Sequence, residues 1–158
     1  MNTIVALLAL GNPWRGDDAL GLLLADAARH RAPRTVELRT RHLLGPEDVL
    51  VMEGAAVALF VDASLHSGIL DLSHLQPAAQ DNVLRHGPSP AQALGWAGLV
   101  LEHVPPAFQL AIAGIAFEAV VGLTPGAASH LEKALTFLNG LLAEPCAEHW
   151  MACCGSIT

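Results

Sequence analysis

Basic residues are scarce in this sequence. Its 158 residues include 8 lysines and arginines against 15 aspartates and glutamates, and the formal net charge is −7 with the histidines neutral. A protein that binds nucleic acid through its surface needs a positive face to meet the phosphate backbone. The charge balance therefore argues against a nucleic-acid partner, whereas it leaves a neutral or cationic protein partner open.

Cysteines are also few. Cys146, Cys153 and Cys154 all lie close to the C-terminus, and an odd number clustered at one end is not typical of a disulfide framework. With His149 they resemble a metal-binding tail, but adjacent cysteines are poorly spaced for a closed zinc site. We expect residues 144–158 to form a flexible, cysteine-containing tail, and the chain to work in the reducing cytoplasm.

Long apolar runs are absent, although hydrophobic residues make up 53% of the chain and charged residues 15%. No run reaches the roughly 18 apolar residues that a membrane-spanning helix needs, so we expect no membrane span. The apolar run 3–10 could be mistaken for a signal peptide, but no basic segment precedes it, and Gly11 and Pro13 end it early. We expect it to be a buried first strand of one folded domain, residues 1–158.

Strand and helix patterns alternate along the chain. The continuous apolar runs 3–10 and 56–62 favour central parallel strands that are buried on both faces. Between them, leucines at three- and four-residue steps from Asp17 onward predict a helix. The other expected elements are strands at 35–39 and 107–114, a short strand or ribbon at 68–74, and helices at 46–54, 90–103 and 127–143. This alternation predicts an α/β sandwich with a largely parallel sheet.

Candidate functional residues follow the expected strands. In such folds these residues gather beyond the carboxyl ends of the strands. Asp17 and Asp18 follow the first strand, Asp62 ends the third, and His86 lies in the loop before the helix at 90–103. A parallel sheet would bring them to one edge, where two carboxylates and an imidazole suit a divalent ion such as nickel or zinc.

Each of these residues also has an ordinary structural interpretation. Asp62 can cap a helix or anchor a loop. Asp17 and Asp18 suit the positive end of a helix dipole. His86 can be a solvated loop histidine, one of several histidines near loops. The others are His42, His66, His74 and His103.

The segment GNPWRGDDALG, residues 11–21, invites comparison with phosphate-binding loops because it joins a strand to a helix. It matches neither the GxGxxG nor the GxxxxGK[ST] pattern, and its two aspartates would repel a phosphate. We therefore discount nucleotide binding.

Several motifs together resemble those of the hydrogenase maturation endopeptidases. The opening strand is followed by Gly11-Asn12, then Asp17-Asp18 and Gly21, with Ala19 in place of a glycine that is usual in the family. The segment VALFVDA, 57–63, resembles the family's hydrophobic strand that ends in Asp-Ala. In the family, a histidine precedes a helix and a later strand ends in Gly-Ile. His86 matches the histidine, although its context RHGPSP is unusual for the family, and residues 110–118 match the strand. With GLTPG at 122–126, the resemblance covers about residues 3–143.

The resemblance implies a fold and an activity. The fold would be a three-layer α/β/α sandwich around a mixed, mostly parallel five-stranded sheet. The family removes a short C-terminal peptide from the precursor of the nickel–iron hydrogenase large subunit after nickel insertion. Asp18, Asp62 and His86 take the positions of its metal-contacting, catalytic residues. The metal would be the nickel of the substrate, or another divalent metal. The partner would be that precursor, and we expect a monomer.

Two other interpretations remain open. Peptidyl-tRNA hydrolases also begin with an apolar strand and Gly-Asn-Pro, but here the loop continues as WRGDD, 14–18, and lacks their Arg-His-Asn segment. Their tRNA substrate also suits a net charge of −7 poorly. The second alternative is a non-catalytic assembly or binding protein on the same scaffold, since a fold alone does not establish chemistry.

Overall fold

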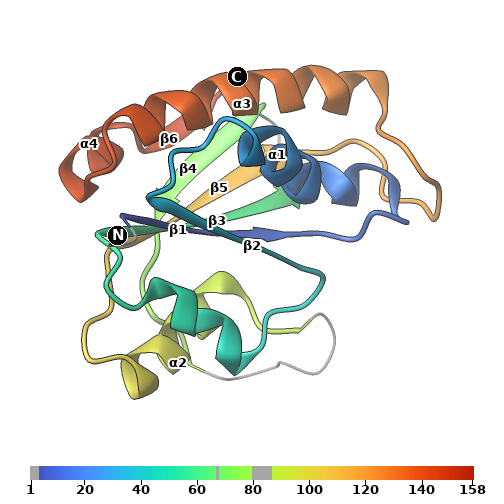
Figure 1. Ribbon diagram of the computed structural model, residues 1–158. Helices are drawn as coiled ribbons and strands as arrows, with labels where there is room; N and C mark the ends of the chain where they lie inside the picture. The colour runs from blue at the N-terminus through green and yellow to red at the C-terminus, as the bar shows by residue number, and fades with distance from the viewer. Residues whose placement is uncertain (1–3, 67, 80–86) are drawn as a thin grey trace.

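A six-stranded sheet with helices on both faces forms the body of the protein (Figure 1). The computed structural model describes residues 4–66, 68–79 and 87–158. The strands are β1 (Val5–Leu10), β2 (Val36–Arg41), β3 (Val57–Ser64), β4 (Leu70–His74), β5 (Ala107–Ala113) and β6 (Gly155–Ile157). The helices are α1 (Leu20–Arg29), α2 (Pro90–Val100), α3 (Pro125–Ala143) and α4 (Ala147–Ala152), with 3-10 helices η1 (Gly16–Ala19) and η2 (Pro46–Met52).

The sheet is mixed and mostly parallel, as the sequence predicts. Its strand order is β2-β1-β3-β5-β4-β6. Strands β2, β1, β3 and β5 run parallel, whereas β4 pairs antiparallel with β5 and β6 pairs antiparallel with β4. The carboxyl ends of the four parallel strands therefore meet at one edge. The expected sheet had five strands, and the sixth is β6 from the end of the chain.

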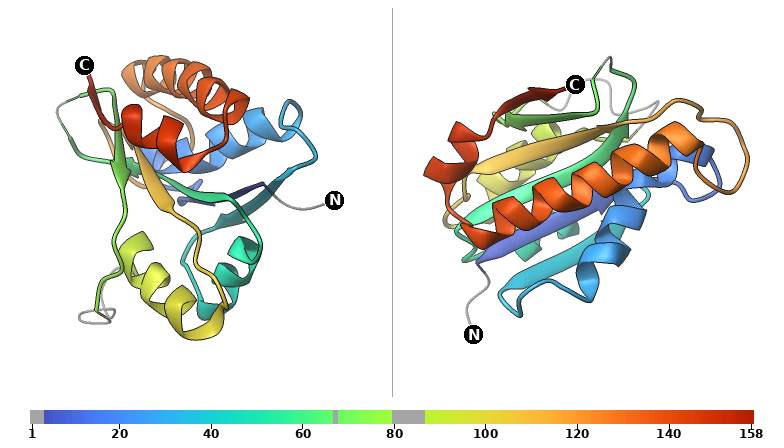
Figure 2. Two further views of the ribbon diagram at one scale, coloured as in Figure 1. Left: turned by 90° about the vertical axis from the view of Figure 1, so that its left-hand side faces the viewer. Right: turned by 90° about the horizontal axis from the view of Figure 1, so that it is seen from above.

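Strand β1 shows why a continuous apolar run belongs at the centre of this sheet. Successive side chains of a strand point to opposite faces. Leu7 packs into the core formed with α1 and α3, while Leu8 packs into the core formed with η2 and α2. Both faces of the strand are buried, and the two helical layers lie on opposite sides of the sheet (Figure 2). The three-layer α/β/α sandwich is therefore confirmed.

The C-terminal segment differs from the expected flexible tail. Residues 144–158 fold onto the body as α4 and β6, with β6 along the free edge of β4. The Trp150 side chain is fully buried. Its ring meets Phe108 edge-on with the centroids 5.4 Å apart, and its indole N–H donates to the Leu141 carbonyl at 2.9 Å. Burial of this large aromatic side chain holds the segment in place.

The cysteines and the helices bear on two of the expectations from the sequence. Cys146, Cys153 and Cys154 are free thiols, in agreement with the expectation of no disulfide framework. Within residues 4–66, 68–79 and 87–158, no helix has the length and apolar character to cross a membrane.

Candidate functional site

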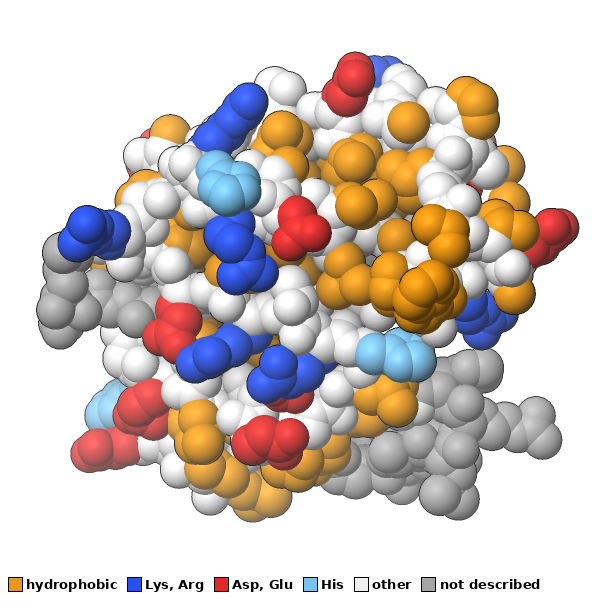
Figure 3. All heavy atoms as spheres, turned by 45° about the vertical axis from the view of Figure 1, so that its right-hand side comes forward, with side chains coloured by type: hydrophobic (Ala, Val, Ile, Leu, Met, Phe, Trp, Pro, Cys, Tyr) orange, Lys and Arg blue, Asp and Glu red, His pale blue; other side chains and the backbone are white. Residues whose placement is uncertain are grey.

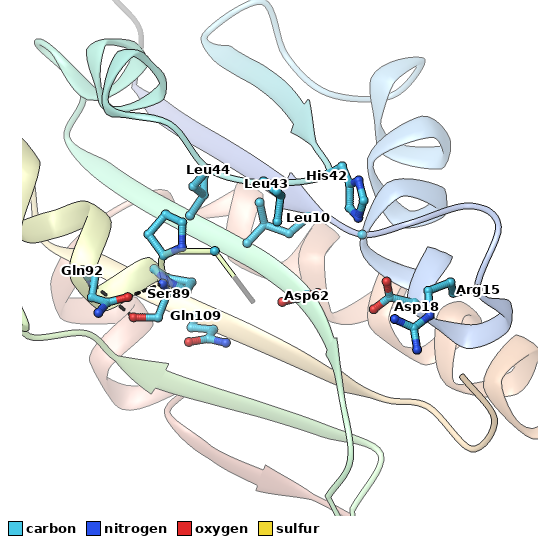
Figure 4. Close-up of a pocket in the computed structure, with 14 residues that line it drawn as sticks. Leu10, Arg15, Asp18, His42, Leu43, Leu44, Asp62, Ser89, Gln92 and Gln109 are labelled. Carbon is cyan, nitrogen blue, oxygen red and sulfur yellow. Dashed lines mark hydrogen bonds between the residues drawn. The ribbon is translucent and has the colours of Figure 1, made fainter. Parts of the chain in front are cut away.

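A cleft of about 850 Å³ opens at the edge where the parallel strands end (Figure 4). It lies on the side of the sheet that η2 and α2 cover. The strand β3 contributes Asp62 and β5 contributes Gln109, while the start of α2 lines the opposite wall with Ser89 and Gln92. The remaining walls come from the segments that follow β1 and β2. Five segments far apart in the sequence therefore build one cleft.

Asp62 reaches the cleft because of its place in the strand alternation. On β3, Ala58 and Phe60 face the η2 and α2 layer, and Asp62 is the next residue on that face. Strand β3 continues to Ser64, two residues beyond the end expected from the sequence. The carboxylate is partly buried, and its Oδ1 accepts a hydrogen bond from the Ala63 N–H at 2.8 Å.

The environment of Asp62 raises its pKa to about 6. Burial is the largest cause, and the nearby negative charge of Asp18 adds to it, while the hydrogen bond from Ala63 opposes both. The carboxyl group is therefore ionised at neutral pH and yet holds a proton more tightly than an ordinary aspartate. Figure 4 shows the Asp18 carboxylate pointing into the cleft on the side of Asp62.

Asp17 is buried inside the protein, whereas its neighbour Asp18 lines the cleft. Its side chain is fully buried and accepts hydrogen bonds at 2.8–2.9 Å from the backbone N–H groups of Ile115, Ala116 and Thr124 and from the Thr124 hydroxyl. Burial alone would raise the pKa of Asp17, but these hydrogen bonds outweigh it and lower the pKa. Asp17 is therefore a structural anchor for residues 115–124, and Asp18 is the acidic residue that faces the cleft.

Two glycines allow the Asp17-Asp18 turn to approach the strands. A Cβ atom on Gly11 would stand 2.3 Å from the Asp18 carbonyl oxygen, and a Cβ on Gly21 would stand 2.3 Å from the Leu10 carbonyl oxygen. Both contacts are with backbone that cannot move aside easily. The glycines of the opening motif thus set the position of Asp18 at the end of β1.

His86, the third predicted site residue, lies outside the described residues. Among the described residues, His42 lies on the wall of the cleft, and Arg15 lies beside Asp18 (Figure 4). His42 directly follows β2, which runs parallel to β1, so the rule that placed Asp18 and Asp62 at this edge also applies to His42. That signal was in the sequence, but only the strand order shows that β2 adjoins β1.

Two of the other histidines have different neighbours. His66 contacts the Ser64 hydroxyl through Nδ1 and lines a separate hollow with Asp71 and Ser156. The ring of His74 lies against Phe108 with the centroids 5.2 Å apart. Neither His66 nor His74 lines the cleft that contains Asp18 and Asp62.

The donor set of the cleft suits a cation. Two carboxylates in a partly buried space repel each other, and a positive ion between them would relieve that repulsion. Within the part of the chain that the structure describes, no three His, Cys, Asp or Glu side chains come close enough together to hold a metal ion. Asp18 and Asp62 can therefore supply two oxygen ligands, and a metal would need further ligands from elsewhere.

No family model and no curated protein matches this sequence. Solved structures do match. The hydrogenase maturating endopeptidase HybD from E. coli superposes with a TM-score of 0.72 at 19% identity, covering 90% of this chain and 93% of that one. The [NiFe] hydrogenase maturation protease HycI from Thermococcus kodakarensis KOD1 gives 0.66 at 17% identity, covering 90% and 94%. The hydrogenase 2 maturation peptidase from Thaumarchaeota archaeon SCGC_AB-539-E09 gives 0.64 at 17% identity, covering 88% and 97%. The chain therefore has the fold of the hydrogenase maturation endopeptidases, as its motifs predict.

Proposed function

We propose that this protein is an endopeptidase that removes the C-terminal peptide from the nickel-loaded precursor of a [NiFe]-hydrogenase large subunit. The observation that carries the proposal is the pair of carboxylates, Asp18 and Asp62, in one cleft at the carboxyl edge of the sheet. The fold shared with solved hydrogenase maturation proteases and the Gly11-Asn12, Asp17-Asp18 and VALFVDA motifs support it.

The nickel in this proposal belongs to the substrate. Nickel accepts mixed oxygen and nitrogen ligands, so Asp18 and Asp62 can contact it through oxygen and His86 through an imidazole nitrogen. Because a bound cation offsets the repulsion between the two carboxylates, the cleft favours a metal-loaded precursor over an empty one. The same ligand types would also take another divalent ion, such as zinc.

Asp62 is suited to move a proton during hydrolysis. Water adds through its oxygen to the scissile carbonyl carbon, and its proton passes to the Asp62 carboxylate. When the carbon–nitrogen bond breaks, the proton goes to the leaving amine, which regenerates the carboxylate. In the metal-free cleft, a pKa of about 6 keeps Asp62 ionised at neutral pH and makes it a stronger base than an ordinary aspartate, whereas a cation bound directly to it would lower that pKa. Its burial and the charge of Asp18 both contribute to that basicity.

Mass spectrometry of a nickel-loaded large-subunit precursor, incubated with the purified protein, tests the proposal. We expect loss of one defined C-terminal peptide, and a rate at least about 100-fold lower with Asp62→Asn. Asp26→Asn is the matched control because Asp26 lies on α1 with its side chain 70% exposed, outside the cleft. A folded wild-type protein that binds the precursor without cutting it would instead support a non-catalytic assembly protein.

A further inference from the structure

Two loops beside the cleft carry an exposed apolar surface. We call it the loop platform, and its residues are Trp14, Ile115, Val120 and Val121, which are 70%, 59%, 52% and 73% exposed. Among the described residues, thirteen large hydrophobic side chains are exposed, and four of them stand on these two loops. Figure 3 shows hydrophobic side chains gathered at this end of the molecule. Such a concentration typically marks a site of protein–protein contact.

The backbone beneath the loop platform is held firmly. The Gly16 N–H donates to the Val120 carbonyl at 2.7 Å, and the Asp17 N–H donates to the Ala116 carbonyl at 2.9 Å. The buried Asp17 carboxylate binds the same loop through its four hydrogen bonds. Binding of a partner here therefore costs little free energy for ordering the loops, which favours tight binding.

The loop platform is continuous with the candidate active site. Arg15 follows Trp14 and lines the cleft, and its guanidinium reaches the Phe117 carbonyl of the second loop at 3.5 Å. Asp18 lies one residue beyond the anchor Asp17. The same pair of loops thus presents apolar side chains outward and a cation and a carboxylate to the cleft.

A cleft of about 850 Å³ holds only a short stretch of peptide, so a whole protein substrate must also bind outside it. We propose that the loop platform docks the folded body of the large-subunit precursor while its C-terminal segment occupies the cleft; this rests on the function proposed above. The occupant is the precursor because the platform adjoins the cleft that its chain must enter. Trp14 is the expected centre of the contact, since tryptophan is enriched among residues that dominate binding energy.

Kinetics of precursor processing with Trp14→Ser and Val121→Asp test the inference. We expect KM and the Kd for the precursor to rise about tenfold or more, while kcat stays within about twofold of wild type. Leu99→Asp is the matched control because Leu99 is also an exposed apolar residue, 85% exposed on α2. Helix α2 belongs to the layer on one face of the sheet, and α1 and α3 belong to the layer on the other face. Circular dichroism would verify that all three variants fold.

Each alternative outcome has its own meaning. Wild-type KM and Kd in both platform variants, with processing intact, would overturn the docking inference and leave the proposed function standing. A wild-type dimer in analytical ultracentrifugation that Val121→Asp converts to monomers would assign the platform to a second copy, and would also overturn the inference. A folded wild-type protein that neither binds nor processes the precursor would overturn both.

Discussion

Asp18 and Asp62 lie in one cleft, and the charge of Asp18 helps to raise the pKa of Asp62. Burial of Asp62 is the larger cause, and together they bring its pKa to about 6. Asp18 follows β1, and Asp62 lies near the end of the neighbouring parallel strand β3. This relationship underlies the cation site and the general base that we propose for the pair, and it can be tested apart from any substrate.

Asp62→Asn should stabilise the protein more at high pH than at low pH. The pKa of Asp62 rises from 3.8 to about 6 on folding, so its favourable contribution is complete below the unfolded value and is lost as the pH rises through about 6. The shift corresponds to about 3 kcal/mol, and partial exposure reduces the expected gain to about 1–2 kcal/mol. Urea unfolding of both proteins at about pH 4.5 and about pH 8 measures the difference. A gain that does not depend on pH would contradict this account.

Asp18→Asn should lower the pKa of Asp62 without returning it to the ordinary value. The substitution removes the nearby negative charge, while the burial that is the main cause of the shift remains. Carbon NMR titration of the metal-free protein, with the side-chain carboxyls labelled, would follow Asp62 directly. An unchanged midpoint would mean that Asp18 stands too far away to influence Asp62.

Asp17→Ala should lower the free energy of unfolding by about 3 kcal/mol or more, because four hydrogen-bond donors lose their shared carboxylate. Since the pKa of Asp17 is lowered, its stabilising effect is present at neutral pH and is lost as the pH falls below the unfolded value. Asp18→Ala is the neighbouring control and should change stability far less. Thermal unfolding would measure the stability that each variant loses. Equal losses in Asp17→Ala and Asp18→Ala would contradict the assignment of Asp17 as the anchor and Asp18 as the cleft residue.

His86→Ala should abolish processing of the nickel-loaded precursor, because the family motif predicts His86 as the third metal contact. His42 also lines the cleft, so His42→Ala is the comparison, and we expect it to retain measurable processing. Mass spectrometry of the precursor C-terminus gives the result. Loss of processing in His42→Ala but not in His86→Ala would move the third contact to His42.

Trp150→Ala should destabilise the protein by about 3–5 kcal/mol, because the side chain is fully buried against Phe108 and its N–H is paired. Met151→Ala changes the next residue, which is 50% exposed, and should have a small effect. Chemical denaturation of both variants compares them. Similar small losses in the two would mean that the C-terminal segment adds little to the fold.

The strands and helices of the body could be predicted because each leaves a local pattern. The unbroken apolar run of β1 follows from burial on both faces, and the spacing of leucines in α1 follows from one buried helix face. The C-terminal segment leaves no comparable pattern. The segment is anchored mainly by one side chain, Trp150. This side chain contacts Phe108 and Leu141, which are far apart in the sequence and come together only in the folded structure.

The sequence by itself determined that carboxylates follow the apolar strands and that a parallel sheet would gather them, since both depend on local patterns and strand direction. The family resemblance pointed to Asp18, but the local patterns themselves could not determine which of the two adjacent aspartates would serve the cleft. That was decided by residues 98 to 107 positions further along, whose N–H groups and hydroxyl bind Asp17 and leave Asp18 facing Asp62. Hydrogen bonds between distant segments form only when the whole sheet is assembled, so the tertiary structure supplies the physical reason that Asp17 is the anchor and Asp18 the candidate catalytic residue.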